Sequence, residues 1–405
     1  MDVFDVIIVG GGPAGSAVAT LVTSTGRRVL VVEKSRFPRE KLCGEFISPE
    51  CAPILQRLGV FDRVVKAGAR PIGRMDLVAP DGRKIEVPVS WFTGSGSVAF
   101  GLSRARLDAI LLDRAREAGA IVNEGFHVTT IDRREGRFEV EGRFEGGSKS
   151  RYAARLIVDA SGRGEMFAPR ERRLSETLQT RGHRLFACKI HLRGAEGLDG
   201  FGELYFFRGG YGGLSEVEPD EIGPRSNLCF LTTESTLNAA KGDRQHLLDL
   251  TVLSNPAARA RLSNAVPVDG WLGAGPIVYG QRPRVPGVIA VGDARAFIDP
   301  FTGSGILLAL SGAELAARAI KSVDEAREIP ADLVPELVES RYRELYRASI
   351  GRRFRASEML RRLAFTPFSR RLLVPLLARN QGLTRLLALS TRPKRVEEVT
   401  RSQII

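Results

Sequence analysis

Two glycine-rich segments, each directly after a short apolar run, constrain the fold of this chain more than any other feature. The first begins at Gly10, after residues 6–9, and reads Gly-Gly-Gly-Pro-Ala-Gly. The second is Gly292-Asp293, after residues 288–291. An apolar run that ends at glycine is typical of a buried strand that leads into a phosphate-binding turn. Two such turns, separated by most of the 405 residues, predict one long ligand that is held from both sides.

The first segment has the G-x-G-x-x-G spacing of a dinucleotide-binding turn at the start of a helix. Gly10 permits the tight turn, Gly12 lets the backbone approach a pyrophosphate, and Gly15 lets the helix pack closely on the strand. The helix N-terminus offers free N–H groups and a partial positive charge to the phosphates. A second strand at residues 28–32 ends in Glu33, about 20 residues past the loop, where a ribose hydroxyl acceptor is expected. This loop does not distinguish NAD from FAD, but the second glycine segment favours FAD.

The composition is that of a soluble globular protein, with 43% hydrophobic residues. No apolar run approaches the roughly 20 residues of a spanning helix, and no secretory signal is expected before a strand that starts near residue 4. The sequence therefore predicts a cytoplasmic protein, with a membrane-peripheral one as the alternative. No metal site or disulfide framework is predicted from the spacing of the four cysteines, Cys43, Cys51, Cys188 and Cys229.

The rest of the pattern predicts an α/β chain that contains a second, antiparallel sheet. Helices are expected at residues 48–58, with Ser48 as N-cap and Pro49 first, and at residues 104–118. A β-like stretch at residues 89–102 precedes the second helix, and residues 163–183 indicate a loop. Alternation with many glycines predicts an antiparallel sheet in residues 184–275. A β-meander is expected from strands at residues 121–123, 127–132, 137–144 and 152–158.

Three further segments carry a resemblance to a known family. They are Ser103-Arg104-Ala105-Arg106-Leu107-Asp108, Asp159-Ala160-Ser161-Gly162, and Gly292-Asp293-Ala294 followed by Asp299-Pro300-Phe301-Thr302-Gly303-Ser304-Gly305. With the first glycine loop, they make the chain resemble the FAD-dependent oxidoreductases of the class A flavin monooxygenase, geranylgeranyl reductase and flavin halogenase superfamily. The resemblance covers roughly residues 4–320, and the order of the motifs matters more than any one of them.

The resemblance implies a Rossmann-like FAD-binding domain of the p-hydroxybenzoate hydroxylase type, an inserted antiparallel substrate domain and a C-terminal helical region. The expected FAD-binding domain is discontinuous, and its parts are residues 1–70, 101–165 and 276–325. The β-sheet substrate domain takes residues 71–100 and 166–275, and the basic helical region takes residues 326–405.

The same resemblance implies which residues hold FAD. Asp293 would accept a hydrogen bond from a ribityl hydroxyl, and the backbone N–H groups of Gly303 to Gly305 would face the pyrimidine edge of the flavin. The full set of expected FAD-binding residues is Gly10, Gly12, Pro13, Ala14, Gly15, Glu33, Lys34, Arg104, Val128, Gly292, Asp293, Pro300, Gly303, Ser304 and Gly305.

Candidate catalytic residues come from two segments. Residues 38–45 resemble a K-x-C-G loop that lies near the flavin in the reductases, which implies Lys41 and Cys43; a buried packing role for Cys43 is an equal alternative. Residues 211–216 keep only Tyr211 of the reductase Y-x-W-x-F-P pattern. The halogenase W-x-W-x-I-P pattern is not matched, and Lys41 and Lys189 are the candidates for a halogenase lysine.

The favoured function is an NAD(P)H-dependent monooxygenase that hydroxylates a hydrophobic, aromatic or polyketide-like compound through a flavin C4a-hydroperoxide. NADPH or NADH is expected as a transient reductant, because the chain has only one complete dinucleotide fingerprint. The alternative is reduction of an isoprenoid or lipid double bond, as in the geranylgeranyl reductases. A flavin halogenase and an electron-transfer flavoprotein are less favoured.

Much of the +13 net charge lies in the last third of the chain, where arginines alternate with leucines. The favoured interpretation is a helical cap whose apolar face packs on the core and whose charges are solvated. The alternatives are peripheral contact with a membrane and contact with an acidic carrier protein that presents the substrate. Nucleic-acid binding is not predicted, because no recognition motif accompanies the charge.

Overall fold

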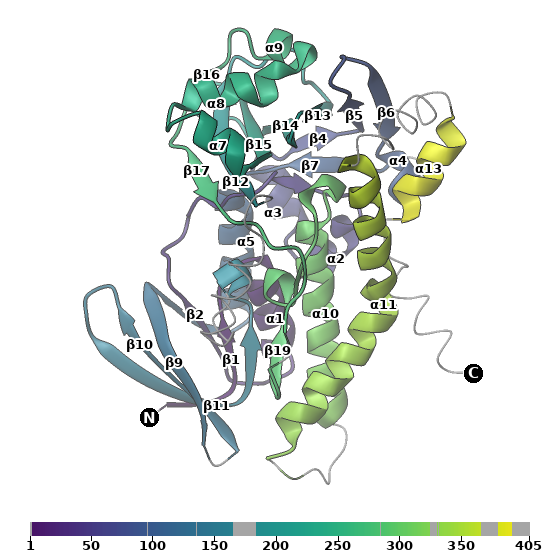
Figure 1. Cartoon of the computed structure of the whole chain (residues 1–405). Helices are drawn as coiled ribbons and strands as arrows, with labels where there is room; N and C mark the ends of the chain where they lie inside the picture. The colour runs from purple at the N-terminus through teal and green to yellow at the C-terminus, as the bar shows by residue number, and fades with distance from the viewer. Residues whose placement is uncertain are drawn as a thin grey trace.

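The structure, a computed structural model, describes residues 2–94, 96–134, 136–164, 184–283, 285–324, 330, 332–365 and 380–390. Its central element is a seven-stranded sheet with the order β8-β2-β1-β11-β10-β9, in which β19 also pairs with β11 (Figure 1). The strands are β1 (Asp2–Val9), β2 (Val29–Glu33), β8 (Ile121–Glu124), β9 (Phe126–Arg134), β10 (Arg137–Phe144), β11 (Lys149–Asp159) and β19 (Val288–Ala290).

The long strand β11 has two partners on the same edge. Residues 149–154 pair with β10 in antiparallel fashion, whereas residues 157–159 pair with β19 in parallel fashion. On its other edge β11 runs parallel to β1, which in turn is parallel to β2. The antiparallel strands β10 and β9 therefore extend the sheet beside the N-terminal half of β11. Strand β19 extends the parallel part of the sheet beside the C-terminal end of β11, and the second glycine segment follows β19 directly.

Both faces of the parallel strands are buried, which explains their continuous apolar character. Val6, Ile7 and Ile8 of β1 are fully buried, and successive residues join apolar clusters on opposite faces. One face is covered by the helices α1, α5 and α10. Their bounds are α1 (Pro13–Thr23), α5 (Arg104–Glu117) and α10 (Gly305–Asp324).

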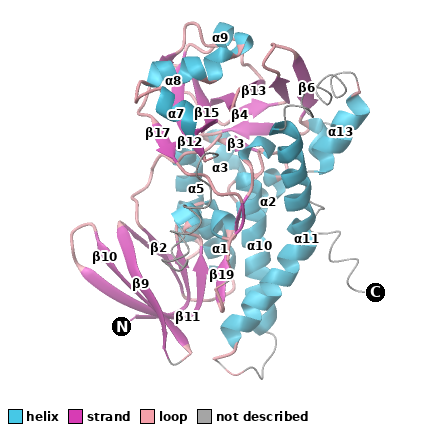
Figure 2. Cartoon of the chain, in the orientation of Figure 1, coloured by secondary structure: helices cyan, strands magenta, loops and turns pink. Residues whose placement is uncertain are grey.

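An eight-stranded sheet lies beyond the C-terminal ends of the parallel strands, with the order β16-β12-β15-β14-β13-β5-β6 and β17 paired with β12. Figure 2 shows helices α7, α8 and α9 over this second sheet. The strands are β5 (Arg74–Val78), β6 (Lys84–Pro88), β12 (Leu185–Arg193), β13 (Phe201–Phe207), β14 (Gly210–Val217), β15 (Arg225–Thr233), β16 (Val266–Pro267) and β17 (Leu272–Ala274). The helices are α7 (Glu234–Ala239), α8 (Arg244–Leu250) and α9 (Pro256–Arg261).

Smaller elements join the two sheets and line the side of the molecule. The long helix α11 (Val334–Phe365) packs along α10, and α13 (Gln381–Ser390) contacts the short helix α4 (Ser90–Thr93). The other elements are α2 (Cys51–Arg57), α3 (Phe61–Lys66), β3 (Phe46–Ile47), β4 (Arg70–Ile72), β7 (Ala99–Gly101), β18 (Gly280–Gln281) and β20 (Ala296–Phe297). Within the described parts of the chain, no helix has the length and apolar character needed to span a bilayer.

Four predictions of local structure need correction. Residues 121–123 do not belong to the meander, because β8 runs parallel to β2 at the opposite edge of the sheet. The helix expected at residues 48–58 begins only at Cys51, because residues 46–47 are held extended by pairing with β7 and residues 48–50 make the turn. The β-like stretch at residues 89–102 contains helix α4 and only the short strand β7. The segment 184–275 does hold the antiparallel strands, but three short helices interrupt it, and the side chains of Thr233, Asp243 and Asn255 cap their N-termini.

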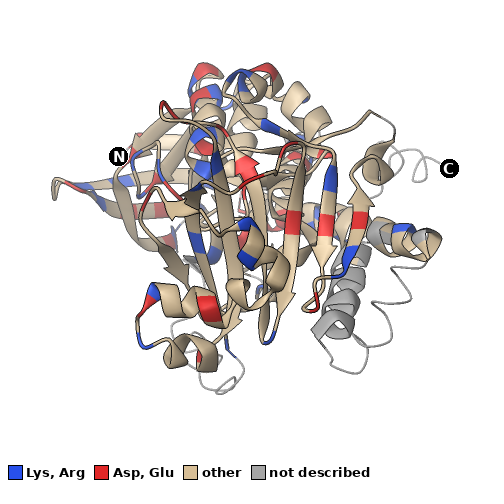
Figure 3. Cartoon of the chain, turned by 90° about the horizontal axis from the view of Figure 1, so that it is seen from above, with Lys and Arg blue, Asp and Glu red and all other residues tan. Residues whose placement is uncertain are grey.

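Basic and acidic residues are interspersed over the second sheet and its helices (Figure 3). Most of the predicted loop at residues 163–183 lies outside the described residues. The basic C-terminal region is described only in part, so its expected contacts with a membrane or an acidic carrier protein stay predictions.

Candidate functional site

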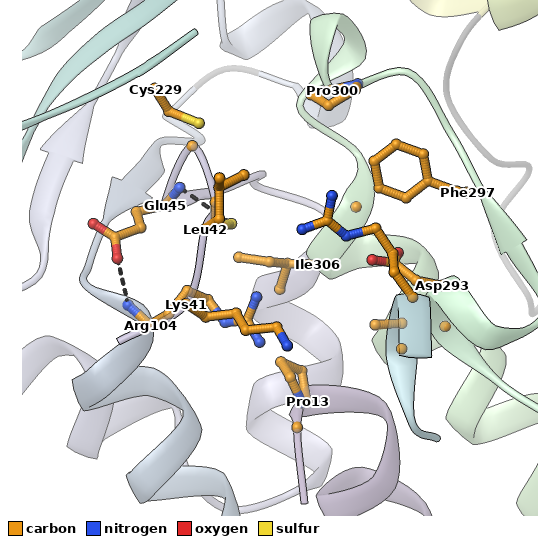
Figure 4. Close-up of a pocket in the computed structure, with 18 of the residues that line it drawn as sticks. Pro13, Lys41, Leu42, Glu45, Arg104, Cys229, Asp293, Phe297, Pro300 and Ile306 are labelled. Atoms are coloured by element: carbon orange, nitrogen blue, oxygen red, sulfur yellow. Dashed lines mark hydrogen bonds between the residues drawn. The ribbon is translucent and has the colours of Figure 1, made fainter. Parts of the chain in front are cut away.

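A cavity of about 750 Å³ lies between the glycine loops of the parallel sheet and the inner face of the second sheet (Figure 4). The first glycine loop, Glu33 and Arg104 line one part of it. Met75, Leu204 and Leu231 from the second sheet line another part. The volume is within the range of about 300–1,000 Å³ that is usual for ligand pockets. The cavity is therefore the candidate cofactor and substrate site.

Packing explains why glycine is needed at two positions of the first loop. Gly10 has a φ of 109°, and a Cβ atom there would lie 2.3 Å from the carbonyl oxygen of Ala160. A Cβ at Gly15 would lie 1.9 Å from the carbonyl oxygen of Gly10. Gly12 is different, because the atoms nearest to its hypothetical Cβ are terminal guanidinium nitrogens of Arg39 and Arg104, at 3.8 and 3.9 Å. The loop thus leaves its backbone open toward two cations.

Asp108 holds these two cations in place. Its carboxylate is fully buried and accepts hydrogen bonds from Arg104 Nε and Nη2, both at 2.7 Å, and from Arg39 Nη1 at 3.0 Å. Burial lowers the pKa of Arg104, but Asp108 outweighs it, so that this pKa lies above its ordinary value. One carboxylate between two guanidinium groups leaves net positive charge beside a helix N-terminus. That arrangement fits the negative pyrophosphate of a dinucleotide.

Lys41 adds a third cation at this end of the cavity. Figure 4 shows its side chain extending toward Pro13, at the start of α1. Burial, together with repulsion from Arg39, Arg104 and other cations, lowers the pKa of Lys41 to about 8. The Lys41 side chain therefore lies at the expected phosphate site, while its backbone carbonyl accepts a hydrogen bond from Lys189 of β12 at 3.3 Å.

The position of Lys41 gives a prediction on pH. A bound pyrophosphate favours the charged ammonium, so FAD binding takes up a proton when the pH is near or above the lowered pKa. We expect FAD affinity to fall as the pH rises through about 8, by at most about tenfold per pH unit. The measurement is titration of the apoprotein with FAD by flavin fluorescence, from about pH 7 to about pH 9.5. In Lys41→Met, affinity should be weaker at the lower pH and this step should disappear; an unchanged step would contradict the assignment.

Glu33 and Asp293 supply carboxylates at two other points of the cavity. Glu33 Oε2 accepts a hydrogen bond from Gly11 N at 2.8 Å and Oε1 accepts one from Ser35 N at 2.9 Å, which orients the carboxylate beside the glycine loop. Burial raises the pKa of Asp293 although cations including Arg163 and Arg104 lie nearby. Each carboxylate can still accept a hydrogen bond from a ligand hydroxyl, as expected for ribose and ribityl groups.

Tyr211 links the second sheet to the loop at residues 299–305. The Tyr211 hydroxyl donates to Asp299 and accepts from the backbone N–H of Phe301 at 2.9 Å. Burial and the negative charge of Asp299 raise the pKa of Tyr211 well above its usual value. The loop ends at Gly303, whose φ is 60°, and leads into α10. Tyr211 is therefore placed to hold this loop and is a poor proton donor.

This role predicts the effect of Tyr211→Phe. Two buried hydrogen bonds to the loop are lost, which should lower the free energy of unfolding by about 1–3 kcal/mol and change the visible spectrum of bound flavin. Tyr152→Phe is the control, since the Tyr152 hydroxyl accepts one hydrogen bond from Asn123 within the main sheet. The control should leave the flavin spectrum unchanged. Identical spectra for both variants would contradict the role of Tyr211.

Most of the expected FAD-binding residues line this one cavity, although they come from five separate parts of the chain. Gly15 and Ser304 do not line it: Gly15 packs against Gly10, and the Ser304 hydroxyl donates to Thr302 O at 3.2 Å. Those that line it are Gly10, Gly12, Pro13, Ala14, Glu33, Lys34, Arg104, Val128, Gly292, Asp293, Pro300, Gly303 and Gly305.

The candidate catalytic residues do not all line the cavity. Lys41, Cys43 and Tyr211 line the cavity, and Cys43 Sγ accepts a hydrogen bond from Glu45 N at 3.3 Å. Lys189 is fully buried and bonded to Glu40 and Glu45, and it does not line the cavity. The sequence did not single out Arg39, Asp108 or Glu45. For Asp108, its place four residues after Arg104 was a usable signal.

Comparisons with known proteins agree with this site. Residues 3–169 match the family described as FAD binding domain. The chain is 29% identical over 364 residues to digeranylgeranylglycerophospholipid reductase 2 of Methanopyrus kandleri, across 87% of this chain and 84% of that protein. It is 27% identical over 346 residues to flavin-dependent halogenase armH4 of Armillaria mellea, across 78% and 65%. The solved structure of the myxobacterial chondrochloren halogenase CndH has a TM-score of 0.76 at 23% identity, across 100% of this chain and 89% of that one.

The glycine loop, its cations and the family match define an FAD-dependent oxidoreductase fold with an FAD binding domain at residues 3–169. The chain is a relative of the FAD-dependent enzymes that include geranylgeranyl reductases and flavin halogenases, which is the superfamily that the motifs predict. The predicted α/β fold class is confirmed as well.

Proposed function

We propose that this FAD-dependent enzyme is a monooxygenase that hydroxylates a hydrophobic, aromatic or polyketide-like small molecule, with NADH or NADPH as the transient reductant. The observation that carries the proposal is the chemistry of the cavity wall on the second sheet. Among the described residues of that wall, the titratable side chains are Tyr211 and Cys229. Burial raises the pKa of both. The substrate would therefore meet an apolar wall that is poor in proton donors.

A cavity wall with few proton donors favours hydroxylation over reduction of a double bond, because the two reactions need protons at different places. Hydroxylation replaces a C–H bond of the substrate by C–OH, while dioxygen, the nicotinamide hydride and one proton give the second oxygen atom as water. Addition of hydrogen to a double bond needs a proton delivered to a substrate carbon as well as the hydride. Bound FAD would supply the redox chemistry in both reactions. The side chains of the second sheet orient the substrate and exclude water, and they do not supply that carbon-bound proton.

The chain's own residues would divide the work between two regions. Arg39 and Arg104, oriented by Asp108, would neutralise the pyrophosphate, and Asp293 would accept a ribityl hydroxyl. Tyr211 would fix the loop at residues 299–305 against the second sheet. Lys189 would not act on the substrate, since it is buried behind the lining residues Glu40 and Glu45, is ion-paired with both, and does not itself line the cavity. Halogenation through that lysine is therefore not proposed.

The second candidate is reduction of an isoprenoid or lipid double bond. It is favoured by the similarity to the digeranylgeranylglycerophospholipid reductase over 87% of this chain and by the place of Cys43 and Lys41 on the cavity. Lys41 would be the candidate proton donor, although the bound pyrophosphate would raise its pKa above the value of about 8 that it has without FAD. In this version the proton would come from the cofactor side of the cavity.

One experiment separates the two candidates. The FAD-loaded protein is supplied with NADPH or NADH and a panel of apolar phenols, polyketide-like aromatics and prenyl lipids, in air and without oxygen. A monooxygenase consumes oxygen in proportion to product, and its product gains one oxygen atom by mass. Anaerobic loss of a double bond with a gain of two hydrogens would replace the monooxygenase proposal by the reductase.

A further inference from the structure

A buried group of charged side chains lies between the cofactor loop and the second sheet. Its centre is Glu45, which is fully buried, as are Lys189 and His191 of strand β12. Lys189 Nζ donates to Glu45 Oε1 at 2.6 Å and to Glu40 Oε2 at 2.7 Å. His191 Nε2 lies 2.6 Å from Glu45 Oε2, and its Nδ1 lies 2.5 Å from Asp269 Oδ2. Two side chains of the second sheet thus converge on a single carboxylate.

The geometry defines the charge of this group. His191 has a carboxylate at each ring nitrogen, and both nitrogens can donate only in the imidazolium form. Burial lowers the pKa of His191, but the hydrogen bond and charge of Glu45 outweigh it and raise this pKa. Burial also raises the pKa of Glu45, and the hydrogen bond from His191 with the charge of Lys189 brings it below its ordinary value. Glu45 is therefore an anion between two cations.

Glu45 also contacts the helix that carries the cofactor arginine. Its Oε1 accepts a hydrogen bond from the backbone N–H of Arg104, the first residue of α5, at 2.8 Å. Negative charge at a helix N-terminus is stabilising, because the first N–H groups of the helix have no partner within it. Glu45 itself has a φ of 55°, a left-handed conformation that costs energy for a residue with a side chain. The fold retains this strained residue where its carboxylate reaches α5 and β12 together.

We propose that Glu45 is a positioning residue for the cofactor: it fixes the first turn of α5, and with it Arg104, against Lys189 and His191 of the second sheet. The Arg104 guanidinium faces Gly12 of the phosphate loop, so a shift of this turn displaces a cation that FAD needs. Through Glu45, the sheet that forms the substrate wall would set the position of a cofactor-binding side chain. The inference does not depend on which reaction the enzyme performs.

The test compares Glu45→Gln with Glu203→Gln. Glu203 is a matched control: it is equally buried, lies on β13, does not line the cavity, and binds Lys84, Arg261 and Tyr205. Both variants lose a buried charge and should lower the melting temperature of the apoprotein. We expect Glu45→Gln to weaken FAD binding by about tenfold or more, and Glu203→Gln to change it by less than about twofold. FAD affinity is measured by fluorescence titration of the apoprotein at about pH 7.

A double-mutant cycle with Arg104→Lys then distinguishes positioning from a general loss of structure. If Glu45 acts through Arg104, Glu45→Gln should weaken FAD binding much less in the Arg104→Lys background than in the natural chain. The same weakening factor in both backgrounds, or no weakening by Glu45→Gln alone, would overturn the proposal. If Glu45→Gln cannot be purified folded, Lys189→Met carries the same cycle, because it removes the cation that shares Oε1 with Arg104 N.

Discussion

Gly10→Ala is expected to yield a folded protein that does not retain FAD. The added methyl group would lie 2.3 Å from the Ala160 carbonyl oxygen, and the φ of 109° is unfavourable for alanine. Strain and overpacking of this kind cost about 1–3 kcal/mol each. The glycine loop can relieve both only by moving away from strand β11, which displaces its N–H groups from the phosphates. We expect FAD affinity to fall by about 100-fold or more, as measured by fluorescence titration and by absorbance of the purified protein.

Gly26→Ala is the matched control for this prediction. Gly26 also has a positive φ, 85°, but a Cβ atom there would have no neighbour within 4 Å. The Gly26→Ala substitution therefore introduces backbone strain but no close contact of the added methyl group. It should lower the free energy of unfolding by about 1 kcal/mol and leave FAD affinity unchanged. Retention of flavin by Gly10→Ala at the level of Gly26→Ala would refute the close packing of the loop against β11.

Asp108→Asn is expected to destabilise the apoprotein strongly and to make the remaining stability depend on FAD. Removing one partner of a buried ion pair costs about 3–5 kcal/mol, because the partner charge is left without compensation. Here Arg104 and Arg39, whose side chains are 12% and 14% exposed, both lose their carboxylate. The FAD pyrophosphate can replace part of that negative charge. The rise in melting temperature on adding FAD should therefore be larger in the variant than in the natural chain.

The control for this prediction is Asp113→Asn on the same helix. Asp113 is paired with Arg116 at the surface, where both side chains are substantially exposed, and such pairs contribute about 0–1 kcal/mol. This variant should change neither the apoprotein stability nor the shift caused by FAD by more than that amount. If Asp108→Asn behaved like Asp113→Asn, Asp108 would not be the residue that orients the two arginines.

The parts of the site that could be predicted from the sequence are those with a local signature. The strand, the glycine turn and the start of helix α1 are adjacent in the chain, and Glu33 lies one strand further on. The requirement for glycine at Gly10 and Gly15 follows from contacts that any such turn makes. For this reason the first loop and the fold class follow from local patterns, whereas the choice of FAD over NAD also needs the second glycine segment, nearly 300 residues away.

The parts that could not be predicted depend on contacts between distant residues. Arg39 has no local pattern that connects it to Asp108, and Glu45 meets Lys189 and His191 only because β12 crosses the loop that contains it. In the same way, the sequence indicates Lys189 as a candidate lysine, but only the fold shows that it is buried, paired with two carboxylates and absent from the cavity lining. Helix α4 has no such signature for a different reason: its four residues form a single turn, and helical periodicity becomes visible only over about 11–18 residues.

The pairing of β19 with the C-terminal end of β11 has a consequence for biosynthesis. The flavin pocket needs Gly292 and Asp293, which reach β11 only after the whole second sheet has left the ribosome. A nascent chain that ends before this strand holds the first phosphate loop but cannot close the pocket around the flavin. Complete enclosure of the flavin therefore requires a polypeptide that has been synthesised past Asp293.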